Sequence, residues 1–426
     1  MNPELRFKDQ DGNAFPDWEE KKIKEIGEVC SGGTPNTNEP KFWNGEIQWF
    51  TPSEVGKDKY VYNSLRTISA SGLKKSSACI LPINTLLVST RATLGEISIA
   101  KKECSTNQGF HPIIVNNDND NEFIYYCSPI IKKYCFENAS GSTFLEISKK
   151  KFEKCLLPIA NIEEQKKIAK ILSDIDKKIE SQATLVEKLK NTKDAMLVKM
   201  FPQGESKVPE IRFDGFSGDW KKIDVRYLIN EAIIEKPMDG NHGEKHPVSS
   251  EYVEDGIPFL MASDVKDGKV DLDNCKFISK SRAEKLDKGF ARNNDVLLTH
   301  KATIGETAIL TGLNTEYAML TPQVTYYRII DNKKLNHFYL YSAFMSKQFQ
   351  KDIHIAATQS TRSYIGIVKQ HKLKIWFPID IQEQEKIGQF FSNLDKEIEI
   401  NQQKYEKLCD VKKALLSKLF PTKEDE

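Results

Sequence analysis

Polar residues suited to nucleic-acid contacts occupy matching positions in the two halves of this chain. Arg91 and Lys301 each stand just before a glycine-containing turn. Arginine can bind a phosphate or a guanine edge through two hydrogen bonds, whereas lysine acts as a point charge. Gln108 and Gln323 also correspond, and glutamine suits an adenine edge. The alternatives are a surface cation beside a turn and a glutamine that bonds nearby backbone.

Glycines and short polar side chains extend this set. The segment 32–38 combines both, so it fits either a loop that enters a groove or an ordinary surface turn. Hydroxyl pairs at 142–143 and 360–361 fit either phosphate contacts or structural caps. The predicted nucleic-acid contacts are Gly32, Gly33, Thr34, Asn36, Arg91, Thr93, Gln108, Ser142, Thr143, Lys301, Thr303, Gln323, Ser360, Thr361 and Arg362.

Catalytic motifs are absent from the sequence. It contains no phosphate-binding loop, no dinucleotide fingerprint, no nucleophile elbow and no Asn/Asp-Pro-Pro-aromatic tetrapeptide of the kind that amino-methyltransferases use. His242 and His246 flank a carboxylate, but we expect a solvated loop there rather than a metal site. Trp18 and Trp220 are expected to anchor cores rather than stack on bases. We therefore predict no catalytic residue, no metal and no cofactor in this chain.

Composition sets further limits. The 426 residues suggest two to three domains, and 39% hydrophobic residues suffice for real cores. The net charge is only +1, so this chain alone is expected to bind DNA modestly. Eight cysteines without a C-x-x-C pair, no visible signal peptide and no bilayer-spanning apolar run predict a cytoplasmic protein that does not enter membranes.

An internal repeat decides the architecture. The segments 3–7 and 209–213 match, as do 17–23 with 219–223, 47–55 with 257–265, and 91–96 with 301–306, in the same order in both halves. Each half closes with a segment, 158–202 or 378–421, that carries a Glu-Gln pair near its start. Apolar residues recur in it with a seven-residue period, and it ends at Pro202 or Pro421.

This rhythm predicts two long helices that pair antiparallel as a coiled coil, although two amphipathic helices packed on their own domains are the alternative. Two polar breaks coincide, Gln182 with Asn401 and Lys193 with Lys412, and polar seam residues fix register. The predicted seam residues are Ile168, Leu172, Ile175, Ile179, Val186, Leu189, Ile387, Phe391, Leu394, Ile398, Tyr405 and Leu408.

The remaining segments predict mixed α/β domains related by a pseudo-two-fold repeat. Short apolar runs at 79–81, 85–90 and 295–299 are typical of strands, and 123–136 and 334–350 have helical spacing. The predicted boundaries are an N-terminal segment 1–16, a first globular domain 17–157, a helix 158–202, a linker 203–218, a second globular domain 219–377 and a helix 378–421.

Two diverged domains on paired helices suit duplex DNA, whose readable edges recur with every turn. The chain resembles the specificity subunits of Type I restriction–modification systems. The resemblance covers essentially the whole chain and rests on the order of short motifs, repeated twice. In the first half these are 18–23, 31–35, 91–95, 107–110, 141–143 and 157–159, followed by the Glu-Gln helix start. The second half departs from it, with Glu235-Lys236-Pro237 near the place of Gly-Gly-Thr-Pro and Pro322-Gln323-Val324 in place of Asn-Gln-Gly.

The resemblance implies two target-recognition domains that each read one half of a bipartite DNA target, and helices that set the spacer and dock partners. It implies two methyltransferase subunits that bring S-adenosylmethionine, and restriction subunits that use ATP and magnesium. The chain itself would then be non-catalytic. A self-contained nuclease or methyltransferase, and a coiled-coil scaffold that binds proteins, are the rival hypotheses.

Overall fold

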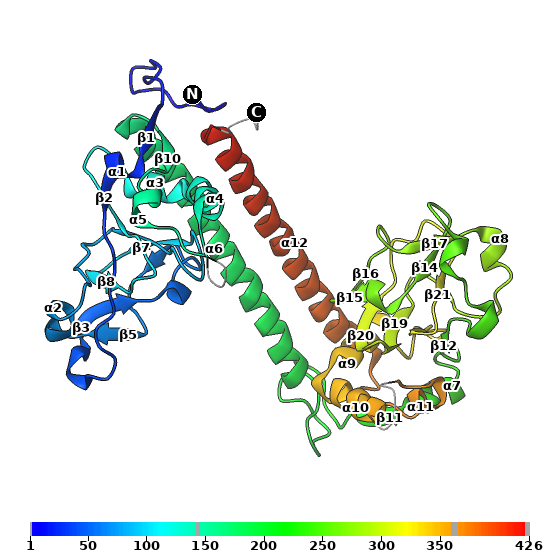
Figure 1. The fold of residues 1–426 in the computed structure, drawn as a ribbon. Helices are drawn as coiled ribbons and strands as arrows, with labels where there is room; N and C mark the ends of the chain where they lie inside the picture. Colours follow the sequence, from blue (N-terminus) through cyan, green and yellow to red (C-terminus); the bar gives the residue numbers. More distant parts are fainter. Residues whose placement is uncertain (1, 142–144, 359–363, 422–426) are drawn as a thin grey trace. The chain divides into compact units, whose positions relative to one another are not determined.

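A computed structural model describes residues 2–141, 145–358 and 364–421 of the chain (Figure 1). The fold separates into two compact units, one formed by residues 1–182 with 404–426 and the other by residues 183–403. Each unit contains a mixed α/β domain together with parts of two long helices, α6 (Ile162–Lys199) and α12 (Ile381–Leu419). This arrangement confirms the predicted fold class.

The first α/β domain is built on small sheets. Its strands have the sheet orders β2-β9-β6-β7-β4, β5-β3-β8 and β1-β10. The strands are β1 (Glu19–Lys22), β2 (Gly27–Val29), β3 (Trp43–Phe50), β4 (Tyr60–Val61), β5 (Arg66–Ile68), β6 (Leu86–Val88), β7 (Ile97–Ala100), β8 (Cys104–Thr106), β9 (Ile113–Val115) and β10 (Leu156–Ile159). The helices are α1 (Ile23–Ile26), α2 (Ala70–Lys74), α3 (Asn121–Tyr126), α4 (Ser128–Asn138) and α5 (Lys149–Phe152).

The second α/β domain has sheets of order β12-β22-β19-β20, β13-β17-β14-β21-β18, β11-β23 and β15-β16. The strands are β11 (Lys221–Asp224), β12 (Met238–Asp239), β13 (Tyr252–Val253), β14 (Ile257–Leu260), β15 (Val265–Lys266), β16 (Lys269–Val270), β17 (Lys276–Ile278), β18 (Phe290–Ala291), β19 (Val296–Lys301), β20 (Thr303–Ile309), β21 (Ala318–Leu320), β22 (Val324–Tyr327) and β23 (Lys374–Phe377). The helices are α7 (Val225–Asn230), α8 (Lys280–Ala283), α9 (His337–Met345), α10 (Lys347–Thr358) and α11 (Ile367–Gln370).

Most of the predicted local elements are present. Strand β6 forms within the predicted range 85–90, and β19 begins within 295–299 and continues to Lys301. The predicted helical segments 123–136 and 334–350 overlap α3–α4 and α9–α10. The strand expected at 79–81 is wrong: within it only Leu81 forms a bridge, with Cys104. The long helices lie inside the predicted ranges 158–202 and 378–421, because β10 takes up Leu156–Ile159 and β23 ends at Phe377. The domain boundaries themselves remain a proposal.

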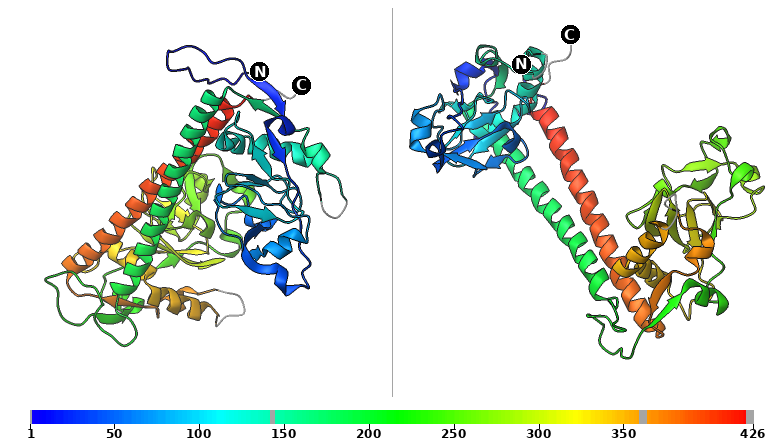
Figure 2. Two further views of the ribbon diagram at one scale, coloured as in Figure 1. Left: turned by 90° about the vertical axis from the view of Figure 1, so that its left-hand side faces the viewer. Right: turned by 60° about the horizontal axis from the view of Figure 1, so that its bottom comes forward.

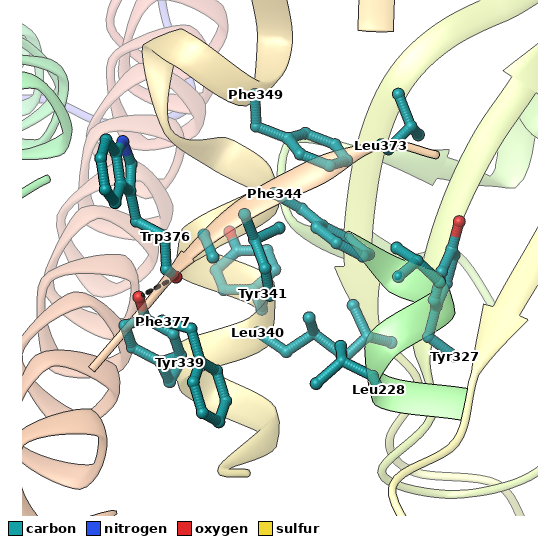
Figure 3. Close-up of a cluster of buried hydrophobic side chains, with 14 of the residues drawn as sticks. Leu228, Tyr327, Tyr339, Leu340, Tyr341, Phe344, Phe349, Leu373, Trp376 and Phe377 are labelled. Atoms are coloured by element: carbon teal, nitrogen blue, oxygen red, sulfur yellow. Dashed lines mark hydrogen bonds between the residues drawn. The ribbon is translucent and has the colours of Figure 1, made fainter. Parts of the chain in front are cut away.

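The core of the second domain is aromatic (Figure 3). Phe344 stacks on Phe349 at 4.5 Å and meets the ring of Tyr327 edge-on at 4.8 Å. The hydroxyl of the fully buried Tyr339 donates a hydrogen bond of 2.6 Å to the carbonyl oxygen of Trp376 in β23. This bond gives the polar end of Tyr339 a partner inside the core, which a buried hydroxyl requires.

Both long helices contribute to these cores. Ile168 and Leu172 of α6 belong to the core of the first domain, whereas Ile387 and Phe391 of α12 belong to that of the second. The first turns of α6 and α12 therefore pack on the domain that precedes each helix, as the alternative to a coiled coil predicted. All twelve predicted seam residues, which lie in the described chain, are buried or partly buried. Their individual roles in the seam remain a prediction.

Ion pairs join α6 to α12 within each unit. Lys412 Nζ lies 2.6 Å from Asp176 Oδ1 in one unit, and Lys193 Nζ lies 2.5 Å from Asp395 Oδ1 in the other. Asp176 precedes Lys193 in α6, whereas its partner Lys412 follows Asp395, the partner of Lys193, in α12. The two helices therefore run antiparallel. A domain tyrosine completes each cluster: Tyr126 and Tyr341 donate to Asp176 and Asp395 at 2.6 Å and 3.1 Å. The polar breaks predicted at Lys193 and Lys412 are thus paired.

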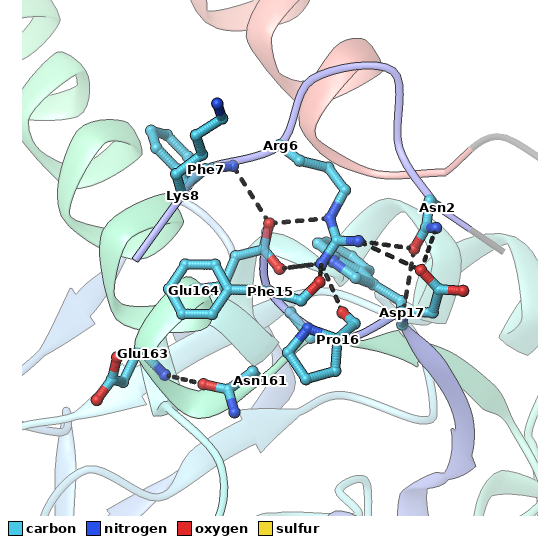
Figure 4. A network of polar contacts seen from close by, with 12 residues as sticks. Asn2, Arg6, Phe7, Lys8, Phe15, Pro16, Asp17, Asn161, Glu163 and Glu164 are labelled. Atoms are coloured by element: carbon cyan, nitrogen blue, oxygen red, sulfur yellow. Dashed lines mark hydrogen bonds and ion pairs between the residues drawn. The ribbon is translucent and has the colours of Figure 1, made fainter. Parts of the chain in front are cut away.

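A buried carboxylate organises the start of α6 (Figure 4). The Glu164 side chain has 0% exposure and accepts hydrogen bonds from Arg6 Nη2 at 2.8 Å, Trp18 Nε1 at 3.0 Å and the Phe7 backbone at 3.3 Å. The hydrogen bond with Glu164 also raises the pKa of Arg6. Trp18 is buried, as predicted.

The same arrangement recurs at the start of α12. Glu383 accepts from Arg212 Nε at 2.7 Å and from Trp220 Nε1 at 3.3 Å. The repeated Arg-Phe and Asp-Trp segments therefore supply the arginine and the tryptophan that bind one buried carboxylate in each half. In the first unit the N-terminal segment also lies beside the end of α12 (Figure 2). The Leu5 amide donates there to the Lys418 carbonyl at 2.9 Å.

We predict that Glu164→Ala lowers the free energy of unfolding by about 3 kcal/mol, because it leaves Arg6 and the Trp18 indole without their shared acceptor. Urea unfolding of the full chain, followed by circular dichroism, measures the change. Glu163→Ala, at the exposed neighbouring position, is the control. Equal stability of the two variants would contradict the role given to Glu164.

Candidate nucleic-acid interface

Matching strained turns present Arg91 and Lys301. The residue after each is an alanine in the left-handed region, Ala92 with φ 66° and Ala302 with φ 70°. This conformation costs a non-glycine residue roughly 1–2 kcal/mol and is concentrated at functional sites. The Arg91 and Lys301 side chains are both exposed. Two diverged domains therefore share one unfavourable backbone feature at the predicted contact position.

In the first domain the predicted contacts gather around one hollow of about 240 Å³. Its lining consists of Pro52, Arg91, Ala92, Asn107, Gln108 and Gly109. Thr34 joins this group, since its hydroxyl donates to Gln108 Oε1 at 2.6 Å. Thr93 donates to the Pro52 carbonyl at 3.0 Å and so braces the turn. The structure thus brings Thr34, Arg91, Thr93 and Gln108 together.

Arg91 has an acidic neighbour, Glu146. Its Nε lies 4.0 Å from Glu146 Oε2, and both side chains are nearly half exposed. The two residues also form an isolated backbone bridge. An exposed pair at this distance is weak and is screened by salt, so a phosphate can replace the carboxylate as the partner of Arg91.

Two tryptophans of β3 hold the 32–38 segment. Trp49 Nε1 donates to the Gly33 carbonyl at 2.9 Å, and Trp43 Nε1 donates to the Asn36 carbonyl at 3.1 Å. A Cβ at Gly32 would lie 1.9 Å from the Asn107 carbonyl oxygen, so only glycine fits there. Gly32 and Gly33 are buried, whereas Thr34 and Asn36 are exposed. The two glycines therefore position the loop, and direct contact is left to its polar residues.

The second domain uses its matching glutamine differently. Gln323 Oε1 accepts from the Ala262 amide at 3.3 Å, and Thr303 donates weakly to the Ala262 carbonyl at 3.5 Å. The first domain has Pro52 in place of Ala262, and proline has no amide hydrogen to donate. Gln108 therefore stays exposed, whereas Gln323 is partly buried and caps a turn.

Five predicted contacts lie outside the described residues, namely Ser142, Thr143, Ser360, Thr361 and Arg362. The residues that follow both gaps are placed: Glu146 and Tyr364 form bridges with Arg91 and Lys301. Trp43 and Trp49 are anchors of the loop that were not predicted from the sequence. Both lie in β3, and their spacing of six residues, which in a strand puts both on the same face, was the available signal.

Comparison with known proteins identifies the family. A family profile described as "Type I restriction modification DNA specificity domain" matches residues 16–191 and again residues 241–409. These two matches cover most of the 426 residues and fall once on each half of the repeat. The chain belongs to this family. Each half of this Type I specificity-domain protein thus carries one copy of the domain, and each match extends over most of a long helix.

Named relatives agree with this assignment. The MjaIX specificity subunit of Methanocaldococcus jannaschii is 38% identical over 194 residues, which are 44% of this chain and 45% of that relative. In that alignment the chain spans about half the length of the relative. The MjaVIII specificity subunit of the same organism is 24% identical over 99% of this chain and 96% of its own length.

Solved structures share the fold. The S subunit of a Type I restriction–modification system from M. genitalium has a TM-score of 0.64 at 17% identity, and the match covers 100% of both chains. A chain from a study of complex assembly in a Type I system has a TM-score of 0.54 at 16% identity.

The described residues contain neither a membrane-spanning helix nor a cluster of metal ligands. No helix there is long and apolar enough to cross a membrane. No group of three or more His, Cys, Asp and Glu side chains in that part of the chain could hold a metal ion.

We predict that Ala302→Gly raises the free energy of unfolding by roughly 0.5–1 kcal/mol, because glycine adopts a positive φ without the Cβ clash. Thermal unfolding of the full chain measures it. Ala308→Gly, inside β20, is the control and should destabilise the protein. Loss of stability in Ala302→Gly would show that the turn is not strained.

Proposed function

We propose that this protein is the DNA-reading specificity subunit of a Type I restriction–modification enzyme. Each α/β domain reads one half of a bipartite duplex target, and the chain has no catalytic role of its own. The observation that carries the proposal is the family match, which falls twice on the chain and includes in each half the strained turn with its cation. The hollow around Arg91 and Gln108 supplies the donors that a base edge or a phosphate needs.

The paired helices are proposed to set the spacer between the half-targets and to dock partner subunits. The antiparallel ion pairs at Lys412 and Lys193 support a fixed register of α6 against α12. Exposed apolar residues on these helices, Ile171, Leu185 and Ile400, provide surface for a partner.

The partners follow from the same proposal. Two methyltransferase subunits bring S-adenosylmethionine and modify adenine, and restriction subunits use ATP and magnesium. The net charge of +1 supports this division, because a nearly neutral chain gains phosphate contacts from its partners. The proposed site of action is the cytoplasm, where the bacterial or archaeal chromosome and incoming DNA are found.

We predict that Arg91→Ala weakens recognition of one half-target about tenfold or more and leaves the sequence preference for the other half unchanged, because Arg91 lies in one domain only. The measurement is sequencing of methylated adenines after the chain and its methyltransferase subunits have acted on a randomised DNA library.

Lys57→Ala, an exposed lysine of the same domain outside the hollow, is the control. Equal loss at both half-targets in Arg91→Ala, with unfolding unchanged, would contradict the assignment of one half-target to each domain. A wild-type complex that methylates no bipartite target would reject the proposed function itself.

A further inference from the structure

The loop that follows β12 occupies in the second domain the place of the 32–38 segment in the first. Gly33 donates its amide hydrogen to the Thr106 carbonyl at 2.8 Å, and Gly240 donates to the Thr321 carbonyl at 3.2 Å. Thr106 and Thr321 immediately precede the matched segments with Gln108 and Gln323. The counterpart of the glycine loop is therefore residues 239–242, not the segment 235–237 to which the sequence comparison pointed.

Gly240 brings this loop close to the neighbouring strand end. A Cβ at Gly240 would lie 1.7 Å from the Leu320 carbonyl oxygen, so no other residue fits without movement. Asn241 is buried, donates to the Lys288 carbonyl at 2.8 Å and accepts from the Asp287 amide at 3.2 Å. The loop is thus held from both sides, and the residue after Asn241 has a defined position.

That residue is His242, and a buried carboxylate orients it. Its Nε2 lies 2.9 Å from Asp239 Oδ2, and the side chains are 50% and 3% exposed. Lys288 Nζ forms an ion pair with the other oxygen, Asp239 Oδ1. Burial raises the pKa of Asp239, but the hydrogen bonds from Lys288 and His242 outweigh burial and lower it overall. One buried anion therefore holds two partly exposed donors, and the second ring nitrogen of His242 is not used by Asp239.

The Lys301 turn lies near this loop. His300, which precedes Lys301 in β19, is fully buried and interacts electrostatically with both Asp239 and His242. Its ring nitrogens have no hydrogen-bond partner among the residues that the structure describes. Burial lowers the pKa of His300 to about 4, so its ring is neutral at physiological pH and does not repel a cation beside it. Strands β12 and β19 both pair antiparallel with β22, and Asp239 and Leu298 both lie opposite Thr325. The 239–242 loop and the Lys301 turn therefore leave the same end of this sheet.

The second domain also holds its glutamine differently from the first. Gln323 is partly buried and accepts from the backbone amide of Ala262, whereas Gln108 is exposed and accepts from the hydroxyl of Thr34, itself an exposed loop residue. A domain with the same scaffold then needs a different polar group to read bases. His242 is the residue that the matching loop supplies, and an imidazole can donate to or accept from a base edge in the major groove.

We infer that His242 is a base-reading residue of the second domain, with Asp239 and Lys288 as the residues that position it. The inference rests on the proposed function and adds a contact that the sequence analysis assigned to a solvated loop. The ligand is a base edge of the half-target read by this domain. A brace that only stabilises the loop is the competing role.

The test compares His242→Ala and His242→Gln in the complex with methyltransferase subunits, by sequencing methylated adenines in a randomised library. The expected result is a relaxed preference, by roughly tenfold, at one position of one half-target in His242→Ala. His242→Gln, which keeps a side-chain amide, should give an altered preference at that same position. The affected half-target should be the one that Arg91→Ala leaves unchanged.

His354→Ala, an exposed histidine on α10, is the matched control. Unfolding temperatures of all variants separate reading from bracing: a lowered temperature with an unchanged target profile in both His242 variants overturns the inference. If His242→Ala fails to fold, the profile of His242→Gln decides. Failure of the wild-type complex to methylate any bipartite target rejects the proposed function, which is a distinct outcome from an unchanged His242 profile.

Discussion

Each half of the chain depends on one carboxylate that has been removed from water. Glu164 and Glu383 are each the third residue of a long helix, with 0% and 2% side-chain exposure. A buried charge is stable only when its hydrogen-bonding capacity is satisfied, so each glutamate requires an arginine and a tryptophan from a segment far away in the sequence. This requirement joins the segment before each α/β domain to the start of a long helix. The position of the domain on its helix is fixed as a result.

On this common scaffold the reading surfaces diverge through small backbone differences. The strained alanines, Ala92 and Ala302, keep a cation at the same place in both domains. The environment of the matching glutamines differs because of one proline. Pro52 has no amide hydrogen, whereas Ala262 donates its amide hydrogen to Gln323. A glutamine conserved in position between the halves is consequently exposed in one domain and structural in the other. The two domains can therefore read different half-targets on the same backbone framework.

The sequence could predict those features that depend on periodicity and repetition. The helices α6 and α12 and the equivalence of Lys193 and Lys412 follow from the repeat, and the α/β class follows from short apolar runs beside helical spacing. The aspartates that pair with the two lysines, Asp395 and Asp176, were not predicted. The role of Glu164 could not be predicted, because a glutamate at a helix start is usually exposed and favoured by the helix dipole. The role of residues 239–242 could not be predicted for another reason. This loop shares a backbone hydrogen bond with the 32–38 segment, but in sequence the two share only the glycine at Gly33 and Gly240.

The central claim is that two different readers are kept at a set spacing on DNA by a pair of antiparallel helices. Insertion of seven residues after Gln182 in α6 and seven after Asn401 in α12 tests it most directly, since the heptad pattern is kept while each helix gains about 10 Å. Methylation of a library with variable spacers should then shift to a spacer roughly three base pairs longer, with both half-target sequences retained. An unchanged spacer, in a variant that still reads both half-targets, would contradict the account.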